Sequence, residues 1–194
     1  MREARNGRMA AEVDDAELAR KCREGQPGAW RELVRRFTPL VYRLALRMLR
    51  SPADAEDAAQ KTFLRVHRSL HTYDPGRPLA AWISRIAYHV ALRRLGDRSD
   101  RALAAGVEPD ELGDDGIPGP DHGAEAREAE SLVDEALDRL SAQDRALVTL
   151  RYREGLSDAE LAEATGMPVG TVKTRLFRAR AVLRRLLAPA MGEA

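Results

Sequence analysis

Helical periodicity runs through most of this sequence and is lost over residues 97–125. Glycine, proline and acidic residues there replace the apolar residues that elsewhere recur every three or four positions. Chains of such composition behave as flexible, self-repelling tethers. The sequence therefore predicts an all-α fold, with two small helical domains over residues 14–96 and 126–190 and a flexible acidic linker over residues 97–125.

The overall composition agrees with helices and excludes several classes of protein. Charged residues make up 32% of the 194 residues and aromatic residues only 5%, which suits exposed helices better than a β-sandwich. No stretch approaches the roughly 20 apolar residues of a membrane span, and the N-terminus lacks the apolar core of a signal peptide. We therefore expect a cytoplasmic protein without membrane insertion. The single cysteine, Cys22, excludes an intramolecular disulfide framework.

Local signals divide the N-terminal half into successive helices. Ser51 followed by Pro52 is typical of a helix N-terminus. Pro39 predicts a break in the preceding helical segment, and Gly96 predicts a helix end. Two prolines and a glycine over residues 72–78 predict a loop.

The C-terminal half carries a helix-turn-helix pattern. Capping-box motifs at residues 141–144 and 157–160 begin two helices, Gly166 ends the second, and Pro168 precedes a third with an apolar stripe. Residues 171–187 include six basic residues and no acidic one, although the net charge of the chain is only +1. A duplex can meet this basic face, because Arg and Lys donate to phosphates and guanine edges while Thr and Phe contact thymine methyl groups.

Two groups of motifs resemble the extracytoplasmic-function (ECF) sigma factors of the sigma-70 family. In the C-terminal half the resemblance rests on residues 140–147, 151–157 and 170–180, and in the N-terminal half on residues 54–60, 62–64 and 81–87. The two groups occur in the order that the family has. The resemblance implies a subunit of RNA polymerase that reads and opens promoters, with sigma region 2 at residues 14–96 and region 4 at residues 126–190.

The resemblance also implies which residues meet core RNA polymerase and promoter DNA. The helix with the Asp-Ala-Glu-Asp motif is expected to dock on the β′ clamp, and the C-terminal domain on the β flap. The expected core-polymerase contacts are Asp54, Asp57, Gln60 and Leu64. The expected minus-ten DNA contacts are Tyr73, Arg77, Trp82, Arg85, Tyr88, His89 and Arg93. The expected minus-35 DNA contacts are Thr171, Lys173, Thr174, Arg175, Phe177 and Arg178.

The sequence departs from the family pattern at three of these places. His89 stands where the family commonly has asparagine, and Arg93 stands near a position that is often acidic. Both departures bear on the base preferred at minus ten. Lys61 follows Gln60 where the family usually has glutamate, which bears on one contact with core polymerase.

Two other functions fit parts of the sequence. The C-terminal helix-turn-helix alone would suit a stand-alone transcriptional regulator that binds a palindrome as a dimer, although the N-terminal half carries no ligand-pocket or dimerisation signature. The acidic linker and the exposed helices would suit a module that binds a regulatory protein. The resemblance implies such a partner, an anti-sigma factor.

An enzyme is the least supported class. His67 and His71 form an i, i+4 pair without a third metal ligand nearby. The sequence has neither a phosphate-binding loop of the G-x-x-x-x-G-K-[ST] type nor a nucleophile elbow of the G-x-S-x-G type. We therefore expect no catalytic residue, no metal site and no cofactor.

Overall fold

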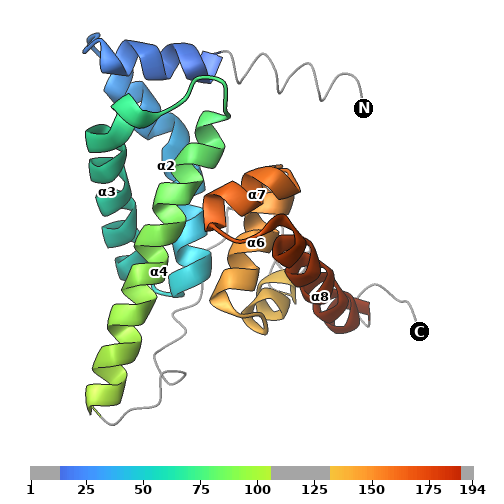
Figure 1. Cartoon of the computed structure of the whole chain (residues 1–194). Helices are drawn as coiled ribbons and strands as arrows, with labels where there is room; N and C mark the ends of the chain where they lie inside the picture. The colour runs from blue at the N-terminus through green and yellow to red at the C-terminus, as the bar shows by residue number, and fades with distance from the viewer. Residues whose placement is uncertain (1–13, 106–131, 189–194) are drawn as a thin grey trace, which may run out of the picture.

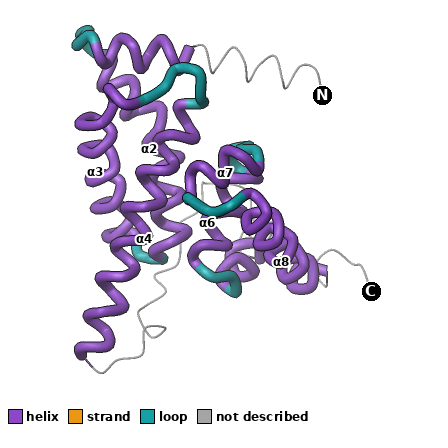
Figure 2. Tube along the Cα trace, viewed as in Figure 1, coloured by secondary structure: helices purple, strands orange, loops and turns teal. Residues whose placement is uncertain are grey.

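The computed structural model describes residues 14–105 and 132–188, and all regular elements within these ranges are helical (Figures 1 and 2). The N-terminal half contains a helix over residues 14–23, α2 (Ala29–Leu49), α3 (Pro52–Ser69), the short 3-10 helix η1 (Leu70–Thr72) and α4 (Leu79–Ala105). The C-terminal half contains a helix over residues 132–138, α6 (Ala142–Tyr152), α7 (Asp158–Thr165) and α8 (Val169–Leu187). The predicted all-α fold is confirmed. Residues 106–125 of the predicted linker lie outside the described residues.

Helices α2, α3 and α4 pack against one another as a bundle. Leu33 and Leu44 of α2, Val66 of α3 and Ile83 of α4 are fully buried between them. Burying an aliphatic side chain of this size contributes about 1.5–3 kcal/mol relative to leaving it in water. The bundle gives a rigid support for the loop between η1 and α4.

Helix α2 continues through Pro39, so the predicted break there is wrong. Pro39 and Thr38 lie on the exposed side of the helix, where water can reach the carbonyl group that loses its N–H partner. The Thr38 hydroxyl donates to the carbonyl oxygen of Val34 at 2.7 Å. On the opposite side Val41 and Leu44 are fully buried, and this packing outweighs the local cost of the proline.

Helix α4 also continues past its predicted end at Gly96, so residues 97–105 of the predicted linker are helical. Arg98 in this extension donates to the carbonyl oxygen of Leu49 at 2.8 Å and pairs with Asp54 at 3.3 Å. A cation near carbonyl groups at the end of a helix is stabilising. These contacts hold the extension on α2 and α3. Glycine destabilises a helix interior by only about 1 kcal/mol, so Gly96 does not end α4.

The C-terminal half begins its helices where the sequence predicts, with one difference in detail. Ser157 and Glu160 form the reciprocal capping box of α7, and Gly166 ends that helix in the left-handed conformation at φ 74°. At the start of α6, Ser141 accepts from the N–H of Asp144 at 3.2 Å and donates its hydroxyl to the Asp144 carboxylate at 2.6 Å. The other carboxylate oxygen of Asp144 accepts from Arg175 of α8.

The two halves pack side by side. Helix α7 lies against α4, and α6 lies against α2, while α8 packs on α6 and α7 and lies on the side away from the bundle (Figure 1). Buried apolar residues of both halves form one continuous cluster. None of the described helices is long and apolar enough to cross a membrane.

Candidate nucleic-acid interface

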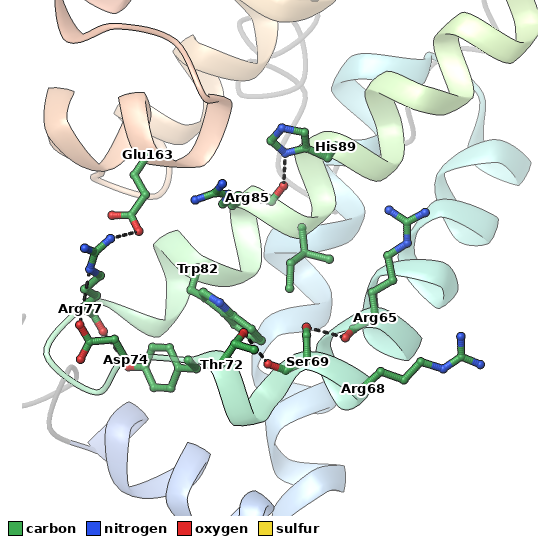
Figure 3. A pocket seen from close by; sticks show the side chains of 12 residues that line it. Arg65, Arg68, Ser69, Thr72, Asp74, Arg77, Trp82, Arg85, His89 and Glu163 are labelled. Atoms are coloured by element: carbon green, nitrogen blue, oxygen red, sulfur yellow. Dashed lines mark hydrogen bonds and ion pairs between the residues drawn. The ribbon is translucent and has the colours of Figure 1, made fainter.

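A pocket of about 800 Å³ opens between the end of α3, the loop after η1 and the start of α4, and α7 contributes one residue to it (Figure 3). Its lining includes five of the seven residues predicted to contact minus-ten DNA, namely Tyr73, Arg77, Trp82, Arg85 and His89. Aromatic rings and cations are the groups that hold unstacked bases and the backbone of a single strand. The pocket therefore has the chemistry that the sequence predicts for this region.

The aromatic side chains of the pocket have different roles. Tyr73 is buried, and its hydroxyl donates to the carbonyl oxygen of Arg77 at 2.7 Å. The Tyr73 ring lies 5.6 Å from the ring of Trp82, tilted by 54°. Trp82 itself is only partly buried. Tyr73 thus supports the loop and the indole, and Trp82 is the ring that remains accessible from the pocket.

Cations reach the pocket from α3, from α4 and from the loop before α4. Arg77 and Arg85 come from the loop and α4, while Arg65 and Arg68 come from the last turns of α3 (Figure 3). His89 on α4 has its Nδ1 atom 2.8 Å from the carbonyl oxygen of Arg85. Arg65 and Arg68 are not among the predicted minus-ten residues, although their i, i+3 spacing places both on one face of α3 and could have indicated them.

Tyr88 and Arg93, the other two predicted minus-ten residues, do not line this pocket. Arg93 is exposed elsewhere on α4. The Tyr88 side chain is only 1% exposed, and burial raises the pKa of its phenol. The charges of Arg175 and Asp144, both in the C-terminal half, also act on this phenol. Tyr88 therefore faces the C-terminal half and is not accessible to DNA in this arrangement.

Most of the residues predicted to read the minus-35 element lie on the outer face of α8. Lys173 and Phe177 are exposed, Phe177 to 68%. Thr171, Thr174 and Arg178 line a shallow hollow at the start of the helix. The opposite side of α8 is buried through Val172, Leu176 and Ala179. The outer face is cationic and accessible, as contact with a duplex requires.

Arg175 differs from the other predicted minus-35 residues because its guanidinium group is already bonded within the C-terminal half. It donates from Nε to Asp144 at 2.7 Å, from Nη1 to Gln143 at 2.7 Å and from Nη2 to the Ser141 hydroxyl at 3.3 Å. These three acceptors surround the N-terminus of α6. Arg175 therefore fixes α8 relative to α6.

The acidic residues predicted to contact core polymerase are partly engaged on the N-terminal half itself. The Asp54 side chain is 17% exposed and accepts from Arg94 Nε at 3.0 Å, and this bond raises the pKa of Arg94. Asp57 pairs with Lys61 at 2.6 Å, which lowers the pKa of Asp57. Gln60 and Leu64 are exposed one turn apart on the same face of α3, Leu64 to 59%.

Comparison with known proteins identifies the family. The Sigma-70 region 2 family matches residues 33–101, and the family described as Sigma-70, region 4 matches residues 130–183. The ECF RNA polymerase sigma factor SigM of Mycobacterium tuberculosis is 36% identical over 176 residues, which cover 91% of this chain and 86% of SigM. The chain belongs to the ECF sigma factors.

Further similarities agree with this assignment. The ECF RNA polymerase sigma factor SigE of Mycolicibacterium smegmatis is 36% identical over 176 residues, which cover 85% of this sigma factor and 64% of SigE. The chain thus spans less than two thirds of that relative. The fold resembles that of the sigma factor RpoE of Bartonella quintana, solved in complex with the anti-sigma factor NepR. The TM-score is 0.69 at 23% sequence identity, over 82% of this chain and 97% of RpoE.

The region 2 match of this sigma factor ends at residue 101, beyond Gly96 and within α4. Within residues 14–105 and 132–188, no group of three or more His, Cys, Asp or Glu side chains could hold a metal ion.

Proposed function

We propose that this sigma factor binds core RNA polymerase and directs it to specific promoters as a subunit without catalytic activity of its own. The observation that carries the proposal is the pairing of two different DNA-type surfaces on one chain. The pocket around Trp82 combines rings and cations suited to a single strand. The outer face of α8 is basic and suited to a duplex groove. In this proposal the pocket holds the opened minus-ten element and the outer face of α8 reads the minus-35 element.

We infer that core polymerase docks on the exposed face of α3. Leu64 is a large apolar side chain on α3 that is 59% exposed. Such a residue, next to the exposed Gln60, suits a protein contact whose centre is dehydrated on binding. Family resemblance assigns this contact to the β′ clamp, with Asp54 and Asp57 beside it, and assigns the β flap to the C-terminal half.

An anti-sigma factor is the regulatory partner expected for a sigma factor. RpoE of Bartonella quintana was solved with the anti-sigma factor NepR. We propose that a comparable protein binds this chain in the cytoplasm, where RNA polymerase works.

A stand-alone regulator, which the basic face of α8 alone would suit, is disfavoured because both sigma-70 regions match this chain. It gives no role to the pocket on the N-terminal half. The two candidates differ in one measurable property, the dependence of promoter action on core enzyme.

Transcription in vitro tests the proposal. Core polymerase with and without this chain is incubated with genomic DNA of the source organism, and the 5′ ends of the transcripts are sequenced. We expect a defined set of start sites only when the chain is present, and loss of those starts with Trp82→Ala or Arg178→Ala. Arg153→Ala, which alters an exposed cation outside α8, serves as the control. Start sites that do not change on adding the chain, together with duplex binding in the absence of core, would favour the stand-alone regulator.

A further inference from the structure

Helix α4 presents a row of side chains to the pocket at helical spacing. Trp82, Arg85 and His89 follow one another at intervals of three and four residues, so they share one face of the helix, and all three line the pocket (Figure 3). Trp82 and His89 are two turns apart, roughly 10 Å along the axis, which exceeds the roughly 3.4 Å step between stacked bases. An extended strand on this face therefore meets Trp82 with one nucleotide and His89 with another.

The ring of His89 is held in one tautomer. Its Nδ1 atom lies 2.8 Å from the carbonyl oxygen of Arg85 (Figure 3), and a carbonyl group can only accept, so Nδ1 carries the hydrogen. In the neutral ring the other nitrogen, Nε2, is then a hydrogen-bond acceptor. The ring also makes an edge contact with the buried ring of Tyr88, with the centroids 5.5 Å apart at 83°. These two contacts orient the imidazole.

The Nε2 atom of His89 is available to a ligand. His89 is exposed, and within residues 14–105 and 132–188 its Nε2 atom makes no hydrogen bond. The four arginines that line the pocket can only donate, so they suit phosphates and the carbonyl groups of bases. His89 instead offers an uncharged acceptor on the α4 side of the pocket.

Unstacked bases differ in what they present to such an acceptor. Cytosine carries an amino group at its 4-position and adenine one at its 6-position, where thymine and guanine carry a carbonyl oxygen. An amino group donates to Nε2, whereas a carbonyl oxygen sets one acceptor against another and leaves both without a partner. A polar group that loses its partner on binding costs free energy. The neutral ring therefore favours cytosine and adenine.

We propose that His89 is a specificity-determining residue, whose Nε2 atom accepts from the amino group of an unstacked cytosine or adenine on a nucleotide other than the one at Trp82. The inference rests on the proposed function for the presence of single-stranded DNA in the pocket. A dependence on pH follows from it, because imidazole changes charge near neutral pH. Protonated Nε2 donates instead of accepting, so the preference for an amino group is lost in acid.

Other charged groups surround His89 and must be common to every comparison. On its own helix these are Arg85 and Arg93, one turn to either side. The charged groups from other elements are Arg65 and Arg68 of α3, Asp74 and Arg77 of the loop, Glu163 of α7, and Asp144 and Arg175, which act on the adjacent Tyr88. At each pH the wild-type chain is therefore compared with His89 variants, in which all these groups are unchanged.

Two matched strands test the proposal on the full-length chain. The probes are fluorescein-labelled short strands of deoxyadenosine and of deoxynebularine, which is deoxyadenosine without its 6-amino group, and anisotropy gives the Kd for each. The variants are His89→Ala and His89→Asn, since the asparagine amide keeps an acceptor that does not become protonated near neutral pH. His71→Ala is the control, because His71 is an exposed histidine of η1 that does not line the pocket.

The measured quantity is the ratio of the Kd for the nebularine strand to the Kd for the adenine strand. At about pH 8 we expect this ratio to be about three- to ten-fold larger in the wild type than in His89→Ala, as one hydrogen bond at an exposed site allows. His71→Ala should keep the wild-type ratio. At about pH 5.5 the wild-type ratio should fall to that of His89→Ala, whereas the ratio in His89→Asn should not change with pH.

The outcomes separate this inference from the proposed function. Binding of both strands with the same ratio in the wild type and in His89→Ala overturns the role of His89 and leaves the proposed function intact. A wild-type ratio that does not change between the two pH values overturns the assignment of Nε2 as the acceptor. Absence of binding by every chain, or binding that Trp82→Ala does not weaken, overturns the inference together with the single-strand role of the pocket.

Discussion

Arg175 is predicted to contact minus-35 DNA, but its guanidinium group instead holds α8 on α6. Its three acceptors lie at the N-terminus of α6, and Asp144 already pairs with its charge. We expect Arg175→Ala to lower the free energy of unfolding by about 1.5–3 kcal/mol, the usual effect of removing hydrogen bonds to a charged group. It should weaken minus-35 duplex binding without changing the salt dependence. Thermal unfolding and fluorescence anisotropy over a salt series measure the two effects.

Arg178 provides the comparison, because it is exposed on the same helix and lines the hollow at the start of α8. Arg178→Ala should reduce the slope of log K against log salt by about one if the residue neutralises one phosphate. Arg175→Lys should fail to rescue Arg175→Ala, since an ammonium group cannot reach the three acceptors together. A reduced salt slope in Arg175→Ala, with unchanged stability, would return Arg175 to the set of direct DNA contacts.

Substitutions of Asp54 and Leu64, both on α3, should affect stability and polymerase binding differently. Leu64 is 59% exposed, so Leu64→Ala should alter the free energy of unfolding by less than about 0.5 kcal/mol. It should raise the Kd for core polymerase about five- to ten-fold, as expected for a contact residue at an interface. Asp54→Asn should mainly lower the free energy of unfolding, because Asp54 pairs with Arg94 and Arg98 of α4, and it should raise the Kd for core polymerase less than Leu64→Ala does. Urea unfolding and surface plasmon resonance on immobilised core distinguish these results, and similar loss of core affinity in both variants with unchanged stability would contradict them.

At the scale of helices, α2 carries a proline that its packing tolerates. Pro39 removes one intrahelical hydrogen bond on the exposed side. Pro39→Ala should restore that bond and raise the free energy of unfolding by about 1–3 kcal/mol. Urea unfolding should show a higher midpoint at an unchanged m-value. A lower midpoint would mean that the backbone conformation fixed by Pro39 is needed for the packing of α2 on α3 and α4.

Helix boundaries were predictable where they depend on neighbouring residues in sequence. Ser51 with Pro52 and Ser157 with Glu160 act within a single turn, so their caps follow from the sequence alone. The continuation of α4 past Gly96 depends on Arg98 reaching the end of α2. Such a contact joins residues far apart in the chain, and propensity does not encode it.

The candidate site was predictable to a similar extent. The residues around Trp82 followed from a family resemblance, and the pocket brings five of them together. The sequence did not show that Tyr88 faces the C-terminal half or that Arg175 is already bonded, because both depend on packing between elements. Glu163 belongs to the pocket only through that packing. No pattern within α7 distinguishes it from an ordinary surface glutamate.

At the scale of the whole molecule, the two halves combine an apolar contact with charge pairing. Arg145 is buried to 6% exposure and bonds to carbonyl oxygens near the end of α2. Within the described residues, arginines of the N-terminal half pair with acidic residues of the C-terminal half, for example Arg43 with Glu154 and Arg47 with Asp134, and these pairs are partly exposed. Salt therefore weakens the ion pairs between the halves more than it weakens the apolar cluster.

Cleavage of the connection between the halves tests how much the ion pairs contribute to the contact between them. A specific protease site inserted between residues 113 and 120 lies in the predicted linker, outside the described residues, and its cleavage leaves two fragments. We expect them to co-elute in size-exclusion chromatography at low salt. They should separate at about 1 M NaCl, where the screening length falls to about 3 Å from about 10 Å at 0.1 M. Glu154→Gln should lower the salt concentration for separation, because it removes the partner of Arg43, whereas Asp158→Asn should not. Fragments that stay together at every salt concentration would show that the apolar cluster alone holds the halves, and fragments that separate even at low salt would show that the contact between them needs the intact chain.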